Sequence, residues 1–164
     1  MDMPVLPYLF QVNVSPGGLP KLAVQKAWVS FSGLEGDSQR NRVVHGGPDR
    51  ALCLYAKEKL DALQQEGHAI APGSSGENLT IAGLAWDRIQ PGDRLHIGKD
   101  VRIDVTSYCV PCRQNARWFV DGNYRRISQD HHPGWSRLYA RVVVEGWVHQ
   151  GDRVRVVRDS KEAC

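Results

Sequence analysis

Two closely spaced cysteines, in Cys109-Val110-Pro111-Cys112, have the clearest capacity for chemistry in this sequence. They follow a segment that predicts a strand ending near Tyr108, and functional groups are commonly displayed where a strand gives way to a turn. A thioredoxin-like redox pair would need the first cysteine at the start of a helix in a βαβ unit, which this segment does not provide convincingly. A structural zinc site would need a second close pair, whereas Cys53 and Cys164 are isolated from one another.

The remaining interpretation is a single reactive thiolate. Positive charge stabilises a thiolate, and Arg113 and Arg117 follow the cysteine pair closely. A buried cysteine without any chemical role is the alternative that the residue types alone leave open. The pair is therefore a candidate site whose chemistry depends on the surrounding fold.

Three further segments could hold a ligand. His45-Gly46-Gly47-Pro48-Asp49-Arg50 precedes an apolar stretch, and its glycines let a backbone come close to a ligand. The loop at 72–78 (PGSSGEN) offers hydroxyls and amides to an oxyanion but lacks the Gly-Lys-Ser/Thr of a nucleotide-binding P-loop. His131 and His132 could bind a metal or transfer a proton, although adjacent side chains diverge on an extended chain. Each of the three is also compatible with an ordinary loop.

Short strands are the elements that must position these loops. Val101–Val105 alternates apolar and polar residues with the period of a half-buried strand, and Leu138–Val144 is a second, more apolar strand. The apolar stretch Ala51–Tyr55 predicts another. One helix is predicted over about Ala56–Glu66, which is followed by a glycine stop. Glycines and prolines between the apolar runs are typical of many short strands joined by turns.

A short pattern occurs twice, as Ile89–Ile97 (IQPGDRLHI) and as Val148–Val156 (VHQGDRVRV). In both copies a Gly-Asp turn opens an alternating strand, because glycine adopts positive φ and aspartate hydrogen-bonds its own backbone. Two similar turns, each leading into a strand of one barrel, explain the repeated pattern better than a repeat architecture does. Closing the sheet would also remove exposed edges, so we predict a mainly β protein, a β-barrel with a few short helices.

The composition excludes several classes of protein. The chain has 41% hydrophobic and 24% charged residues, as ordinary globular proteins do. Its net charge of +3 comes with scattered Lys and Arg, so we expect no nucleic-acid partner, although a small anionic ligand is compatible. The N-terminus does not match a signal peptide, and no apolar run approaches the ~18 residues that cross a bilayer. We therefore expect no membrane association, a cytoplasmic location with reduced cysteines, and a single domain over residues 1–164.

Several motifs, taken in order, resemble the MOSC family, which is named after the C-terminal domain of molybdenum-cofactor sulfurases. They are Val12–Lys21 (VNVSPGGLPK), Gly33–Asp37 (GLEGD), His45–Ala51 (HGGPDRA), Gly76–Leu79 (GENL), Pro111-Cys112 and Gly151-Asp152. The series is similar to that of the small bacterial members and covers the chain from about residue 12 to 157. The resemblance implies a MOSC domain with a β-barrel of the pyruvate-kinase type.

The resemblance also implies a cofactor, the molybdenum cofactor (molybdopterin), which is an anionic pterin phosphate. The cysteine after the proline, Cys112, would be the molybdenum ligand or the carrier of a persulfide, since a thiolate suits both a soft metal and a transferable sulfur. The residues expected around the cofactor offer positive charge, hydrogen bonds or close backbone approach. They are Lys21, His45, Gly46, Gly47, Arg50, Gly76, Glu77, Asn78, Arg113 and Arg117.

Cys109 departs from the family pattern, in which related sequences commonly carry a Pro-Arg step before the Pro-Cys. As a second catalytic thiol it would shield, regenerate or oxidatively lock Cys112. Two classes of function stay open. The first is an oxidoreductase that reduces small N-hydroxylated molecules with electrons from a redox partner protein. The second is a sulfur carrier that receives sulfur from a donor and holds it as a persulfide for cofactor assembly.

Overall fold

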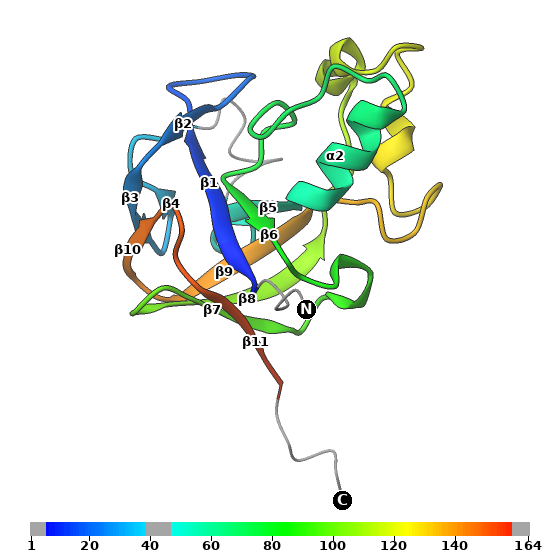
Figure 1. The fold of residues 1–164 in the computed structure, drawn as a ribbon. Coiled ribbons are helices and arrows are strands. Elements are labelled where there is room, and N and C mark those ends of the chain that lie inside the picture. Colours follow the sequence, from blue (N-terminus) through cyan, green and yellow to red (C-terminus); the bar gives the residue numbers. More distant parts are fainter. Residues whose placement is uncertain (1–5, 39–46, 159–164) are drawn as a thin grey trace, which may run out of the picture.

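The structure is a computed structural model of the 164-residue chain and describes residues 6–38 and 47–158. It is mainly β, with few helices (Figure 1). The strands are β1 Tyr8–Val14, β2 Leu22–Val24, β3 Lys26–Ser30, β4 Gly33–Leu34, β5 Leu52–Ala56, β6 Leu79–Ala82, β7 Arg94–Ile97, β8 Val101–Tyr108, β9 Leu138–Val144, β10 Gly146–His149 and β11 Val154–Val157. The helix α2 covers Lys57–Gln65, and short 3-10 turns cover η1 Pro48–Arg50, η2 Trp86–Arg88, η3 Arg113–Trp118 and η4 Tyr124–Ile127.

A large, mostly antiparallel sheet organises the protein, with the strand order β11-β7-β8-β9-β5-β6-β1-β2. A smaller sheet joins β10, β3 and β4. The strands β5 and β6 run parallel, which requires a crossover, and α2 lies on that crossover. This arrangement places the loops before β6, after β8 and before β9 at neighbouring strand ends.

The sheet curls without closing. At its Tyr8 end β1 meets the start of β11, where an isolated bridge pairs Tyr8 with Arg153. The Leu9 amide donates to the Asp152 carbonyl at 2.7 Å. The rest of that edge of β1, from Val12 to Val14, pairs with β2 instead. No sheet among the described residues therefore closes into a continuous barrel, in contrast to the barrel that the sequence predicts.

The predicted elements are present. Leu138–Val144 has the predicted bounds, Val101–Val105 continues to Tyr108, and the helix begins and ends one residue inside the predicted range. The predicted strand Ala51–Tyr55 corresponds to β5, shifted by one residue. The two Gly-Asp patterns open β7 and β11, which pair antiparallel with one another.

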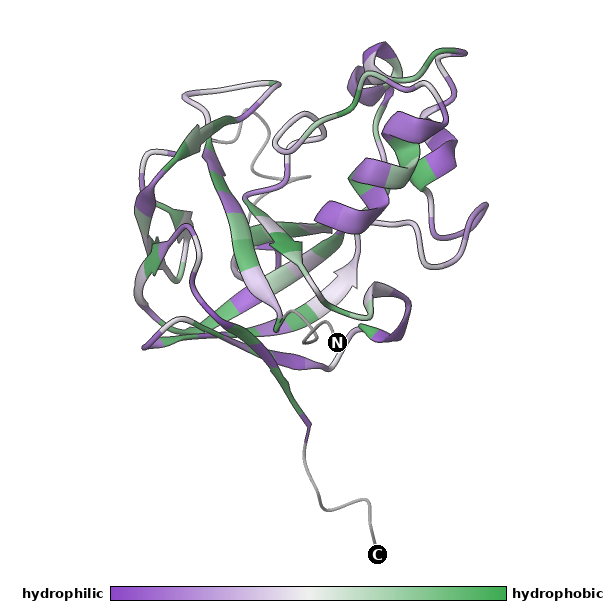
Figure 2. Cartoon of the chain, viewed as in Figure 1, coloured by the Kyte–Doolittle hydropathy of each residue, from purple (hydrophilic) through white to green (hydrophobic). Residues whose placement is uncertain are grey.

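One core cluster joins buried residues of the large sheet, of the small sheet and of α2, such as Ile103, Val29 and Leu63. Every residue of β5 is buried, as expected for a strand in the middle of a sheet. Most of α2 is hydrophilic (Figure 2), but Leu60 and Leu63 are fully buried and pack its inner face onto the core. Among the described residues, no helix is long and apolar enough to cross a membrane.

Candidate functional site

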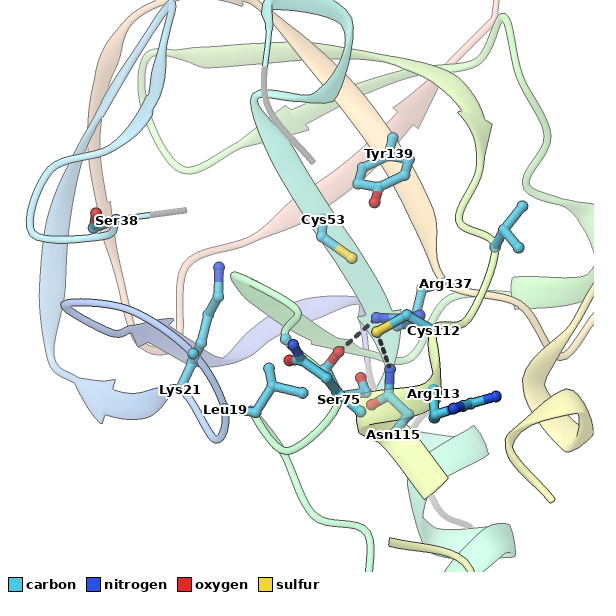
Figure 3. A pocket seen from close by; sticks show the side chains of 14 residues that line it. Leu19, Lys21, Ser38, Cys53, Ser75, Cys112, Arg113, Asn115, Arg137 and Tyr139 are labelled. Carbon is cyan, nitrogen blue, oxygen red and sulfur yellow. Dashed lines mark hydrogen bonds between the residues drawn. The ribbon is translucent and has the colours of Figure 1, made fainter. Parts of the chain in front are cut away.

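A cavity of about 390 Å³ lies where several of these loops meet (Figure 3). Its walls come from the β1–β2 connection, from β5, from the loop before β6, from the segment after β8 and from the start of β9. This volume is in the range that small-molecule sites occupy. The segments that form it are far apart in the sequence and are brought together by the sheet order and by contacts between loops.

Cys112 lines this cavity with a partly exposed thiol. The residue before a proline avoids helical conformation, so Pro111 keeps Val110 out of a helix just before Cys112. Cys112 is still extended, with φ −104° and ψ 164°, and the η3 turn begins at the next residue. In that turn the Asn115 amide nitrogen Nδ2 donates to the Cys112 sulfur Sγ at 3.8 Å. The sequence thus holds a thiol at the start of a turn, with a hydrogen-bond donor directed at it.

Cys109 does not line the cavity and is 3% exposed. It packs in a buried cluster with Cys53 and Tyr139, which do line the cavity. A hydrogen bond to Cys109, together with burial, raises the pKa of the Cys53 thiol, and burial raises the pKa of Tyr139. The thiol partner of Cys109 in this cluster is therefore Cys53, which the sequence interpretation did not include in the site.

Arg137 is the second cavity residue that the sequence interpretation missed. Its side chain is 5% exposed, and its Nη1 donates to the Ser75 carbonyl at 2.5 Å. Its Nε is buried without a hydrogen-bond partner in the described part of the chain. Burial lowers the pKa of Arg137, but the nearby Cys109, Cys53, Tyr139 and Glu77 raise it and prevail. The sequence feature that could have indicated Arg137 as a site residue is its position directly before the apolar strand Leu138–Val144.

Lys21 also lines the cavity, and it is already paired. Its Nζ lies 2.7 Å from Asp37 Oδ2, and the side chain is only 8% exposed. The Lys21 amide donates to the Gly73 carbonyl at 2.9 Å, which ties the β1–β2 connection to the loop before β6. Lys21 thus holds two walls of the cavity together, and the positive charge of its ammonium group is balanced by the Asp37 carboxylate.

Glu77 and Asn78 are fully buried and lie behind the cavity wall. The Glu77 carboxylate accepts hydrogen bonds from the Gly73 amide, Ser75 Oγ and Thr80 Oγ1, at 2.9 to 3.0 Å. Burial raises the pKa of Glu77, in opposition to these hydrogen bonds. Both residues fix the loop that presents Ser75 and Gly76 to the cavity.

The other residues expected around a cofactor have varied positions. Gly76 and Arg113 line the cavity, whereas Gly47, Arg50 and Arg117 do not. The Arg50 guanidinium lies over the Tyr139 ring at 5.2 Å, and Arg117 Nε donates to the Gln114 carbonyl. His45 and Gly46 are outside the described residues.

The chemistry of the cavity follows from its charges and donors. Its charged side chains among the described residues are Lys21, Arg113 and Arg137, without a carboxylate, which suits an anionic ligand. Cys112 offers one soft sulfur donor. The described residues contain no group of three or more His, Cys, Asp and Glu side chains able to hold a metal ion. A metal bound here would need further ligands from a molecule that occupies the cavity.

Comparisons with known proteins agree with these features. The MOSC domain model matches residues 41–155. The chain is 32% identical over 146 residues to the uncharacterized protein YflK of Bacillus subtilis, covering 88% of this chain and 65% of YflK. It is 36% identical over 123 residues to protein YiiM of Escherichia coli, covering 68% of this chain and 54% of YiiM. A reductase of Gibberella moniliformis is 26% identical over 133 residues, with 78% of this chain and 23% of the reductase covered.

A solved structure has the same fold. The crystal structure of YiiM from Escherichia coli matches with a TM-score of 0.71 and 25% identity, over 94% of this chain and 71% of that one. The chain thus spans less than two thirds of the length of the curated relatives that it matches in sequence.

Proposed function

Because the chain belongs to the MOSC domain family, we propose that it binds the molybdenum cofactor and reduces small N-hydroxylated compounds, with Cys112 as the molybdenum ligand. The observation that carries the proposal is the cavity itself, which combines a partly exposed thiol with cationic walls. The likeness to a protein called a reductase supports the redox part of the proposal.

The residues of the cavity fit such a cofactor. Two buried polar atoms of its walls, Arg137 Nε and Asn115 Oδ1, have no hydrogen-bond partner within the described chain, so a ligand must satisfy them or leave them at a penalty. The single thiol matches a metal whose other ligands come from the cofactor. Gly76, at φ +100°, keeps the wall free of a side chain where a pterin would approach.

When bound, the cofactor supplies a metal that accepts electrons one or two at a time and acts on an N–O bond. The chain's own residues perform the remaining tasks. Cys112 would bind the metal through Sγ, and the Asn115 amide would orient that sulfur through its N–H···S contact. The cationic residues hold the anionic parts of the cofactor. We propose that the electrons come from a separate redox protein.

The test compares wild-type protein with Cys112→Ser and Cys109→Ser, all produced in a host that makes the cofactor. Metal analysis gives molybdenum per protein, pterin fluorescence gives cofactor, and loss of an amidoxime with an artificial one-electron donor gives activity. We expect Cys112→Ser to lose both metal and activity, because a hydroxyl is a poor ligand for a soft metal. Cys109→Ser should keep both, since Cys109 lies outside the cavity.

Three results would contradict the proposal. Equal loss in both variants would indicate a functional dithiol. Retention of molybdenum by Cys112→Ser would remove the ligand assignment. Metal-loaded protein without turnover that releases sulfide from Cys112 under mild reductant would replace the enzyme with a sulfur carrier.

A further inference from the structure

We infer that Arg137 is an anion-binding subsite of the cavity, which takes a tetrahedral oxyanion such as a phosphate monoester. The inference deepens the proposed function, on which it rests for the identity of the whole ligand. The subsite itself is argued from the side chain and its surroundings, and it is testable in protein without molybdenum.

The guanidinium of Arg137 is a buried cation without an ion-pair partner among residues 6–38 and 47–158. Only 5% of the residue is exposed, and the hydrogen bond from Nη1 to the Ser75 carbonyl occupies one of its five donors. Its Nε is buried and unpaired among the described residues, and no described carboxylate forms an ion pair with it. Burying a charge without a partner is strongly unfavourable. Lys21, the other buried cation of the cavity, shows the ordinary solution, since Asp37 pairs with it.

No carboxylate among the described residues forms an ion pair with Arg137, although the nearby Cys109, Cys53, Tyr139 and Glu77 raise its pKa. Cys53 and Tyr139 stay protonated at neutral pH, because a hydrogen bond to Cys109 and burial raise the pKa of Cys53 and burial raises that of Tyr139. Glu77 is the nearby carboxyl group, but its oxygens accept from Gly73, Ser75 and Thr80. A ligand in the cavity would supply the direct ion pair that Arg137 lacks among the described residues.

Guanidinium recognises phosphate well, because its planar donors match two oxygens of a tetrahedral anion. Arg113 provides a comparison within the same cavity. It lines the cavity as well, but its side chain is exposed and its guanidinium is drawn pointing away from Cys112 (Figure 3). An exposed arginine binds an anion weakly because water and salt screen it. The subsite should therefore depend on Arg137 and little on Arg113.

The experiment measures the melting temperature of metal-free protein in inorganic phosphate, against chloride at equal ionic strength. With a Kd of about 1 mM, about 10 mM phosphate would raise Tm by roughly 3–5 °C. We expect Arg137→Gln to weaken binding about tenfold or more and to remove most of this shift, while Arg113→Gln keeps it. A shift that survives in Arg137→Gln, or that disappears in Arg113→Gln alone, overturns the assignment.

A second measurement covers the case in which Arg137→Gln does not fold. The Nε–H resonance of Arg137 in wild-type protein, assigned by its absence in Arg137→Lys, should move during a phosphate titration. Movement of other arginine signals without that of Arg137 overturns the subsite. Titration with neopterin monophosphate and with neopterin then distinguishes free phosphate from a phosphate carried by a pterin. If the subsite takes the phosphate of a pterin, neopterin monophosphate should bind through Arg137 and neopterin should not. A protein that binds phosphate but retains no molybdenum keeps the subsite and contradicts only the proposed function.

Discussion

Replacing Asn78 with alanine should destabilise the protein strongly, although the residue lies next to a candidate binding site. Asn78 is fully buried, and its side chain joins two walls of the cavity. Its Nδ2 donates to Asp37 Oδ2 at 2.9 Å, and its Oδ1 accepts from the Cys53 amide at 2.9 Å. Asn78→Ala removes both hydrogen bonds and leaves the Cys53 amide without a side-chain partner.

The magnitude follows from the two contacts. A hydrogen bond to a charged group contributes about 1.5–3 kcal/mol, and a buried amide left unpaired costs about 1–3 kcal/mol. Water entering from the adjoining cavity would offset part of this loss. We therefore expect the free energy of unfolding to fall by about 3 kcal/mol. For a domain of this length that corresponds to a decrease in Tm of roughly 6–12 °C.

Urea unfolding with linear extrapolation measures the change, and an unchanged m-value shows that both states keep their compactness. Asn123→Ala is the matched control. Asn123 lies on an exposed turn, where its side chain accepts from the Arg125 amide at 3.2 Å, and water replaces that contact. It should cost less than about 1 kcal/mol. Losses of equal size in the two variants would refute the view that Asn78 is a structural support rather than a ligand contact.

Three further predictions concern the same region. Gly73→Ala should cost at least about 2 kcal/mol more than Gly92→Ala in urea unfolding. Both glycines have positive φ, but only at Gly73 would the new Cβ clash with a backbone oxygen, that of Lys21; equal costs would contradict this. Iodoacetamide should modify Cys112 at least about tenfold faster than the buried Cys53, as peptide mass spectrometry would show, and equal rates would mean that the cluster opens readily. Burial raises the folded-state pKa of Glu77 above its ordinary 4.5. The free energy of unfolding of the wild type, relative to that of Glu77→Gln, should therefore fall as the pH rises above 4.5. A difference that does not change with pH would contradict this prediction.

Local patterns were sufficient for the elements of the large sheet. Leu138–Val144 could be predicted to the residue because its apolar run is bounded by polar residues. The strand that begins at Val101 was predicted to end near Tyr108, as it does, although the alternation of buried residues extends only to Val105. The open sheet could not be foreseen, because the choice of β2 over β11 as partner for β1 depends on a loop's path and not on a periodicity.

Four of the residues that the sequence predicts for the site line the cavity, namely Cys112, Lys21, Gly76 and Arg113. Cys53, Arg137 and Tyr139 reach the cavity through strand pairing across long stretches of sequence. Cys53 and Tyr139, for example, are register partners of β5 and β9. No spacing rule in a single sequence encodes such a pairing. The same pairing explains why Cys109, so close to Cys112 along the chain, packs against Cys53 instead.

The contact between the first and last strands bears on the order in which this protein acquires its structure during synthesis. The Leu9 amide bonds to the Asp152 carbonyl, and the Gly151 amide bonds back to the Leu9 carbonyl, both at 2.7 Å. The ribosome releases β1 long before residues 151–157. The Tyr8 end of β1 therefore lacks these backbone partners while β2 and β6 can already pair with β1. Contacts of such long range slow folding and expose unpaired backbone to other chains. We therefore expect the nascent chain to expose this end of β1 to other chains until β11 has emerged.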